Sequence, residues 1–405
     1  MDEKTGPEKG IARGDTTIQL STALVHPPQV ELPPDNLPLV APIYQSVKFE
    51  HESVAETLRS LRGEKQGFFY SRSANPTTRL LEHTLAELQG REEAIVCASG
   101  VGAIAQTLLG LLKTGDHVLC FVETYAPTRT LIRRQLARFG IRHTMLSIHD
   151  DAGIERVLKG TPTRLVIFET PTNPVNRIAD IAHITAQARA TGALTLLDNT
   201  LAGFHQHGDT DVDLFLHSLT KYASGHGDVM GGAVIGSAEL IRRLRPEFTL
   251  LGGVLDPHAA WLIQRGLKTY SFRYEAQSAT AMAIAQYLEG HEKVARVHYP
   301  GLPRHPRHEL AARQMRHFGT VLSFDLRAGG AAGDRMADQL KLFSIAASMG
   351  SPESLIIPPG LMGPYDLPAE LNALTGIEPG TVRLSMGLEN AADLIADLGQ
   401  ALASV

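Results

Sequence analysis

Lys221 lies in a stretch whose residue types and spacing suit chemistry. The stretch is DLFLHSLTKYASGHGDVM, residues 213–230, where the apolar run Asp213–Leu216 has the length of a buried strand and a glycine-rich turn follows. Ser218 and Thr220 place hydroxyl groups three residues and one residue before the lysine. Most lysines extend along the protein surface into water. The residues at the neighbouring strand ends must decide whether Lys221 does so or belongs to a functional site.

Three other predicted strands also end in polar groups. Residues 99–101 (SGV) close one strand and open a helix, whose free N–H groups and positive dipole end favour a phosphate. Asn173 follows a second strand in ETPTNP, and Asp198 ends a third in LLDNT, where partial burial requires a cationic or protonated partner. With Lys221, these strand ends supply a phosphate cup, an amide, a carboxylate and an amine.

Pyridoxal phosphate accounts for this whole set of groups. Its aldehyde needs a lysine for a Schiff base, its pyridine nitrogen needs a carboxylate, and its phosphate needs N–H and hydroxyl donors. Lys221 and Asp198 meet the first two needs, and Tyr125, just beyond another strand, could stack on the ring. The phosphate donors would be Gly100, Val101, Ser218 and Thr220.

Tyr70 and Arg72 lie in a loop directly before a predicted helix. Asn75-Pro76-Thr77 is a helix-start signal, and leucines at helical spacing follow it. The fork of an arginine binds phosphate or carboxylate with two parallel hydrogen bonds. The loop is therefore interpreted as a site that binds an anion. The alternative is that Tyr70 and Arg72 are ordinary solvent-exposed residues of a surface loop.

The elements that must position these groups alternate between strand and helix. Near-continuous apolar strands at 92–100, 116–124, 163–170, 193–200 and 213–221 are separated by helical segments. The pattern predicts an α/β fold with a doubly wound, mostly parallel sheet, in which ligands bind at the carboxyl ends of the strands.

The rest of the chain is divided around this sheet. Residues up to about Pro38 are polar and rich in proline and glycine, which predicts an extended or partly disordered arm. We expect an N-terminal arm over 1–63, a large cofactor-binding domain over 64–262 and a smaller C-terminal α+β domain over 263–405.

Composition excludes several classes of partner. The 405 residues are 43% hydrophobic and 20% charged, with a net charge of −5. The chain has no sustained run of basic residues of the kind that binds nucleic acid. No apolar run reaches membrane-spanning length, and the N-terminus lacks the apolar core of a signal peptide. These features predict a cytoplasmic protein that binds neither nucleic acid nor membrane.

Two sets of residues that often bind metals are interpreted without one. Cys97 and Cys120 lie in apolar strands without a CxxC partner and are expected to be buried, reduced thiols. The pairs His205/His207 and His305/His308 have metal-ligand spacing but no convincing third ligand, so we expect solvated loop histidines and no metal.

A dinucleotide-binding motif is a competing interpretation. Residues 100–105 (GVGAIA) fit the pattern GxGxxA after a strand, and Glu123 ends the next strand at about the spacing of a ribose-binding acid. This reading predicts an NAD-dependent dehydrogenase. It leaves Asp198, Lys221 and the hydroxyl groups beside the lysine without a role.

From about Pro42 to the C-terminus, the chain resembles the Cys/Met-metabolism enzymes that use pyridoxal phosphate. This trans-sulfuration family of fold-type I includes cystathionine γ-synthase, cystathionine γ- and β-lyase and methionine γ-lyase. The motifs that carry the resemblance are YSRSANPT, ASGVGA, ETPTNP, DNT, HSLTKYASGHGDV, RGLKT, VHYPGLPRHPRH, SFDL, SMGSPESLI and TVRLSMGLE.

The resemblance implies roles for the cofactor-binding residues. It makes Lys221 the Schiff-base lysine and Cα proton shuttle, places Asp198 at the pyridine nitrogen and Asn173 near the ring hydroxyl, and stacks Tyr125 on the ring. It makes Gly100, Val101, Ser218 and Thr220 the phosphate donors.

The resemblance also implies a shared active site and a substrate clamp. Tyr70 and Arg72 would reach the phosphate of a neighbouring subunit, which implies an active dimer and usually a tetramer. Arg383 with Ser348 would clamp the substrate carboxylate, and Glu353 is counted among the substrate-binding residues.

The same motifs leave the reaction open. Methionine γ-lyases carry a cysteine two residues after the stacking tyrosine, where this chain has Pro127 after Ala126. Phe69, directly before Tyr70, is the residue type that bacterial β-lyases have at this position. YSRSANPT, ETPTNP and Glu353 resemble the γ-enzymes instead. We expect a cystathionine lyase acting by β- or γ-elimination, with a γ-replacement synthase of the cystathionine γ-synthase or O-acylhomoserine sulfhydrylase type as the alternative. A non-catalytic relative is disfavoured because the mapped cofactor contacts are chemically intact.

Overall fold

The structure is a computed structural model that describes residues 11–13, 16–18, 22, 37–362 and 367–405. The chain divides into two compact units, residues 1–42 and 43–405. In the first unit, strands β1 (Ile11–Arg13) and β2 (Thr16–Ile18) pair in an antiparallel manner. Most of the arm expected up to Pro38 lies outside the described residues. The second unit contains all the predicted site residues.

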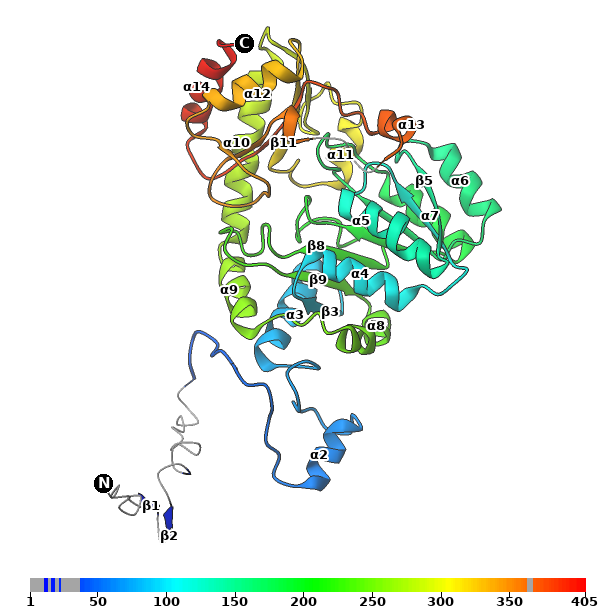
Figure 1. Cartoon of the computed structure of the whole chain (residues 1–405), viewed down its shortest axis with the longest axis vertical. Coiled ribbons are helices and arrows are strands. Elements are labelled where there is room, and N and C mark those ends of the chain that lie inside the picture. Colours follow the sequence, from blue (N-terminus) through cyan, green and yellow to red (C-terminus); the bar gives the residue numbers. More distant parts are fainter. Residues whose placement is uncertain (1–10, 14–15, 19–21, 23–36, 363–366) are drawn as a thin grey trace, which may run out of the picture. The chain divides into compact units, whose positions relative to one another are not determined.

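A seven-stranded, mostly parallel sheet forms the large part of the second unit (Figure 1). Its strand order is β3-β9-β8-β7-β6-β4-β5, and only β9 runs antiparallel to its neighbours. The predicted α/β sheet is confirmed. The strands are β3 (Glu93–Cys97), β4 (His117–Phe121), β5 (Arg142–Leu146), β6 (Leu165–Glu169), β7 (Leu194–Asp198), β8 (Leu214–Ser218) and β9 (Gly232–Gly236).

Helices cover both faces of this sheet, as a doubly wound fold requires. One apolar core joins the sheet to α3 (Pro76–Gln89), α6 (Asp151–Gly160), α7 (Ile181–Thr191), α9 (Pro257–Leu267) and α10 (Tyr270–Glu289). A second core, on the other face, joins it to α4 (Gly100–Leu111), the consecutive turns η1 (Leu131–Gln135) and η2 (Leu136–Phe139), and α8 (Ala238–Leu251). The short helix α5 (Ala126–Thr130) follows β4, and α2 (Val54–Leu61) precedes the sheet.

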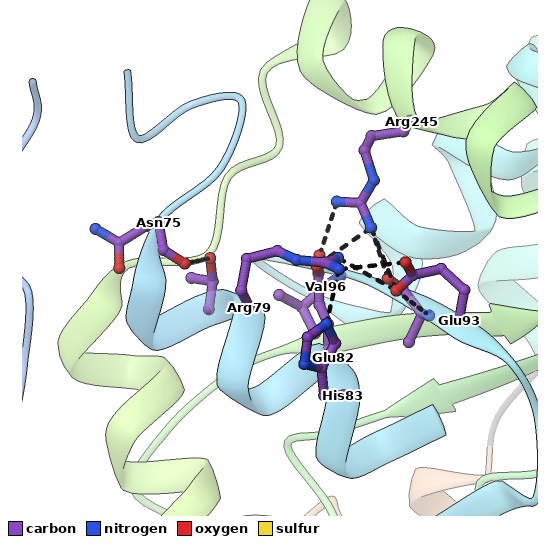
Figure 2. Close-up of polar contacts among 9 residues, drawn as sticks. Asn75, Arg79, Glu82, His83, Glu93, Val96 and Arg245 are labelled. Carbon is purple, nitrogen blue, oxygen red and sulfur yellow. Dashed lines mark hydrogen bonds and ion pairs between the residues drawn. The ribbon is translucent and has the colours of Figure 1, made fainter. Parts of the chain in front are cut away.

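Side chains rather than a further strand close the sheet edge at β3 (Figure 2). The Glu82 carboxylate accepts the Val96 N–H at 3.2 Å, and the Arg245 guanidinium donates to the Ala94 carbonyl at 2.9 Å. Arg245 also pairs with the buried Glu82 at 3.2 Å, so one ion pair satisfies main-chain groups of the edge strand that would otherwise be open to another chain. β3 leads directly into α4, whose first residue, Gly100, lines the cavity described below.

A five-stranded sheet forms the C-terminal part, as the α+β prediction requires. Its order is β10-β11-β14-β13-β12, antiparallel except between β12 and β13. Its strands are β10 (Val294–His298), β11 (Val321–Leu326), β12 (Ser344–Ile345), β13 (Leu355–Ile357) and β14 (Thr381–Ser385). Its helices are α11 (His308–Gln314), α12 (Gly330–Gln339), α13 (Ala369–Asn372) and α14 (Ala391–Leu402), with turns η3 (Pro359–Leu361) and η4 (Ala373–Thr375). We keep the boundaries at 63/64 and 262/263 as a proposal.

The prediction of solvated loop histidines is wrong. His207 is buried with its Nδ1 2.7 Å from the Asn199 Oδ1, and the Nδ1 of partly buried His205 lies 2.6 Å from the Tyr270 hydroxyl. The loop folds inward against α10, and this burial lowers the pKa of each histidine to about 4. His305 and His308 are partly buried against main-chain carbonyls.

Three further observations concern cysteines, metals and membranes. Cys97 and Cys120 are buried free thiols, as predicted. Among the described residues, no cluster of three or more histidine, cysteine or acidic side chains is arranged to hold a metal ion. In the same part of the chain, no helix is long and apolar enough to cross a membrane.

Candidate active site

A cavity of about 470 Å³ opens where β4, β6, β7 and β8 end, and strand β14 contributes to its wall. Ten of the predicted site residues line it, drawn from both sheets. They are Gly100, Val101, Tyr125, Asn173, Asp198, Ser218, Thr220, Lys221, Ser348 and Arg383. Tyr70, Arg72 and Glu353 do not line this cavity. Parallel strands thus gather distant polar residues at one edge, as expected.

Lys221 extends into the cavity and not along the surface. Its Nζ donates a hydrogen bond to the Ser348 Oγ at 2.8 Å, across 127 positions of sequence. Burial lowers the pKa of Lys221, and the positive charge of Arg383 lowers it further. Both effects favour the neutral amine, which is the form that can accept a proton.

Ser348 joins Lys221 to Arg383. The Arg383 Nη2 donates to the Ser348 carbonyl at 2.6 Å, and its Nη1 lies 3.4 Å from the Asn173 Oδ1. Ser348 has a φ of 103°, a conformation that costs a side-chain-bearing residue about 1–3 kcal/mol. Such strain persists where surrounding contacts fix it, and here those contacts are the amine and the guanidinium.

Replacing Ser348 separates the strain from the hydrogen bond. Ser348→Ala and Ser348→Gly both remove the acceptor of Lys221, so we expect both to lose about tenfold in turnover. Only Ser348→Gly relieves the positive φ, so it should be more stable than the alanine variant by about 1 kcal/mol. Steady-state kinetics and denaturant unfolding test this pair, and unchanged turnover in both would contradict the role of the hydroxyl.

Two carboxyl groups lie side by side under the cavity. Glu169 and Asp198 are the last residues of β6 and β7 and are register partners in the parallel pair. Burial raises the pKa of both, and the Asp198 charge helps to raise that of Glu169 to about 8. Asp198 accepts the Thr200 N–H at 3.1 Å.

The phosphate-favouring end of α4 is confirmed as a helix start. The Ser99 Oγ accepts the Gly102 N–H at 3.0 Å and caps the helix. A Cβ on Gly100 would lie 2.9 Å from the Ser218 Cβ, so glycine is what allows the two segments to approach. Gly100, Val101 and Ser218 therefore lie at one corner of the cavity, where N–H and hydroxyl donors can converge on an anion.

Tyr125 is the aromatic residue predicted to stack on the ring. It precedes α5, and its side chain keeps 42% exposure where it lines the cavity. Burial raises the pKa of its hydroxyl, with the carboxyl groups of Asp198 and Glu169 contributing. The tyrosine is therefore neutral, which suits a stacking role.

Glu169 is the site residue that sequence reasoning missed. It was visible only as the first letter of ETPTNP, although an acid directly after four apolar residues repeats the signal that singled out Asp198. In the structure it lines the cavity with 3% exposure.

Comparisons with known proteins agree with this site. The family model described as Cys/Met metabolism PLP-dependent enzyme matches residues 21–403. The chain is 40% identical to the L-methionine gamma-lyase of Pseudomonas putida, covering 90% of this chain and 92% of the relative. It is 38% identical to the cystathionine beta-lyase of Lactococcus lactis, covering 89% and 93% respectively.

Solved structures give the same result. A cystathionine gamma synthase from Xanthomonas oryzae pv. oryzae, in complex with aminoacrylate and cysteine, superposes with a TM-score of 0.85. It shares 37% sequence identity, and the match covers 90% of this chain and 93% of that one. The fold is that of the fold-type I pyridoxal-phosphate enzymes.

This chain belongs to the Cys/Met-metabolism family of pyridoxal-phosphate-dependent enzymes. It is a trans-sulfuration enzyme whose cofactor is pyridoxal 5'-phosphate. The dehydrogenase interpretation is wrong, and Glu123 is not a free ribose-binding acid because its carboxylate pairs with Arg177 at 2.5 Å.

The residues present fit this cofactor. Buried Glu169 and partly buried Asp198 make no ion pair within the described chain, and a cationic pyridine ring would supply positive charge beside them. A capped helix end offers N–H groups to a phosphate, and the partly buried amine of Lys221 lies in the same cavity.

Proposed function

We propose that this enzyme is a carbon–sulfur lyase that cleaves cystathionine or a related sulfur amino acid by β- or γ-elimination. The observation that carries the proposal is the chain of contacts from Lys221 through Ser348 to Arg383. It fixes a base and a carboxylate-binding fork relative to each other, as removal of a proton from the Cα of an amino acid requires.

In this mechanism each residue has one task. Arg383 binds the substrate carboxylate, and Lys221, whose pKa is lowered by burial, removes the Cα proton. The bound cofactor supplies an electron sink for the charge left on Cα. Asp198 would hold the proton of the pyridine nitrogen, Asn173 would lie near the ring hydroxyl, and Tyr125 would stack on the ring. Gly100, Val101, Ser218 and Thr220 would hold the phosphate.

The position of the leaving group decides how often Lys221 acts. A thiol on Cβ departs after one proton removal, whereas a thiol on Cγ requires a second proton removal at Cβ. Lys221 is the base for both steps, because its amine is the one that the cavity presents to the substrate.

A γ-replacement synthase is the second candidate. A cystathionine gamma synthase from Xanthomonas oryzae pv. oryzae, solved in complex with cystathionine, is 38% identical over 90% of this chain. In that reaction an activated homoserine loses its γ-substituent and a thiol takes its place. The same Lys221 and Arg383 would serve both reactions.

Product analysis tests the proposal. We would incubate the cofactor-loaded enzyme with L-cystathionine and identify the keto acid: pyruvate indicates β-cleavage and 2-oxobutyrate indicates γ-cleavage. L-methionine and an O-acylhomoserine with cysteine are run in parallel. Cystathionine formation without keto acid would overturn the lyase proposal in favour of the synthase.

We further propose a homo-oligomer, of the tetramer type, in which Tyr70 and Arg72 complete the cavity of a neighbouring subunit. Both lie outside their own cavity, and Tyr70 is 41% exposed with the Arg72 guanidinium 5.5 Å from its ring centre. Mixed oligomers of Arg72→Ala and Lys221→Ala subunits should recover activity if sites are shared. Persistent inactivity of the mixture would contradict sharing.

A cytoplasmic location is also part of the proposal. It is supported by two buried cysteines that form no disulfide, as is usual in a reducing compartment.

A further inference from the structure

Glu169 is a buried acid for which the proposed mechanism has no task. Its Oε2 accepts the backbone N–H of Tyr125 at 2.9 Å, and its Oε1 accepts the backbone N–H of Asn173, also at 2.9 Å. No ion pair to Glu169 is found in the part of the chain that the structure describes. Both carboxyl oxygens are thus committed to main-chain donors from two different loops.

These two loops carry Tyr125 and Asn173, the residues proposed to stack on the cofactor ring and to reach its hydroxyl. Tyr125 follows β4 by a short turn, and Asn173 lies in the loop after β6. Tyr125 and Asn173 lie beyond the last ladder partners of β4 and β6, which are Phe121 and Glu169, and the carboxyl group accepts both of their N–H groups. Asp198 lies beside Glu169 on the adjacent strand. Glu169 therefore bonds the main chain of Tyr125 and Asn173 and is the strand neighbour of Asp198.

We propose that Glu169 is a positioning residue for pyridoxal phosphate, which fixes the main chain of Tyr125 and Asn173 so that the tyrosine can stack on the ring and the amide can reach the ring hydroxyl. The inference rests on the proposed roles of Tyr125 and Asn173. Glu169 does not touch the ring itself in this account. It acts through the main chain of the two residues that do.

The chemistry of the side chain explains why an acid occupies this position. The two N–H groups bond two different oxygens of one side chain, and a carboxyl group is the side-chain group that offers two acceptor oxygens. A glutamine accepts from one of them and turns its own NH₂ toward the other. Burial and the Asp198 charge raise the pKa of Glu169 to about 8, so the carboxyl pair retains a proton near neutrality and adds little repulsion.

Glu169→Gln tests the proposal against a matched control. Asp397, on α14, is also a buried acid whose oxygens accept two consecutive main-chain N–H groups, those of Lys341 and Leu342, at 2.8–3.1 Å. It lies outside the cavity. Asp397→Asn therefore removes the same kind of contact without approaching the ring.

Three measurements separate positioning from general stability. We would follow the thermal midpoint of the cofactor-free proteins, the dissociation constant of pyridoxal phosphate, and the visible circular dichroism of the bound cofactor. Both variants should lose stability. Only Glu169→Gln should weaken cofactor binding, by about tenfold, and change the circular dichroism per bound cofactor.

Two results would overturn the proposal. If Glu169→Gln binds the cofactor with the wild-type constant and circular dichroism, the carboxyl group does not position the ring. If Asp397→Asn changes both readouts as much, the effect is one of general stability. Wild-type protein that binds pyridoxal phosphate in the same assay shows that such a failure concerns Glu169 and not the enzyme's use of the cofactor.

Discussion

The Lys221→Ala protein should fold normally and lose about 10⁴-fold in turnover, because it lacks the only proposed base for Cα and Cβ. Lys221 forms no ion pair in the described chain, and its burial disfavours the charged amine, so its removal should not lower stability. Steady-state keto acid production and the thermal midpoint of the cofactor-free protein measure the two effects.

An exposed lysine provides the control for this variant. Lys159 on α6 pairs with Glu155 on the surface, away from the cavity, so Lys159→Ala should keep wild-type turnover and cofactor binding. If Lys221→Ala retained more than a few per cent of the activity, the base would have to be another group. If it lost activity through unfolding, the circular dichroism of the cofactor-free protein would reveal it.

Asp198→Asn should weaken cofactor binding and lower turnover, each by about tenfold to a hundredfold, because a neutral amide cannot stabilise the protonated pyridine nitrogen. The asparagine Oδ1 can still accept the Thr200 N–H, which is the bond that Asp198 makes at 3.1 Å. Local structure should therefore persist. Fluorescence titration of the cofactor and steady-state kinetics test the prediction.

Asp213 is the matched control, because it bonds the opposite end of β7, the strand that Asp198 ends. The Asp213 Oδ2 accepts the Thr195 N–H at 2.8 Å and the Thr195 hydroxyl at 2.7 Å, at the start of β7. Asp213→Asn should cost stability and leave cofactor affinity unchanged. Equal losses of affinity in both variants would remove Asp198 from the pyridine nitrogen.

The sheet and its strand ends could be predicted because their signal is local. Each apolar run is followed directly by the polar residue that the strand places at the rim, as with Asp198 after Leu197 and Lys221 after the hydroxyl-bearing Ser218. The helix starts at Asn75 and Ser99 were also local, since each cap bonds an N–H two or three residues ahead.

The remaining contacts depend on packing between distant segments. No spacing rule brings Ser348 to Lys221 or gives it a φ of 103°, because both follow from how the C-terminal sheet meets the first one. The partial burial of His205 depends on contact with Tyr270 of α10, 65 positions further along the chain. Family resemblance supplied Arg383, which periodicity alone could not have connected to the cavity.

Covalent capture of the cofactor tests the central claim most directly. The protein is loaded with pyridoxal phosphate, reduced with borohydride, digested and examined by peptide mass spectrometry. We predict one pyridoxyl phosphate group per chain, on the Lys221 side chain, and none in Lys221→Ala. A group on another lysine, or equal labelling of the variant, would contradict the assignment of Lys221 and the mechanism built on it.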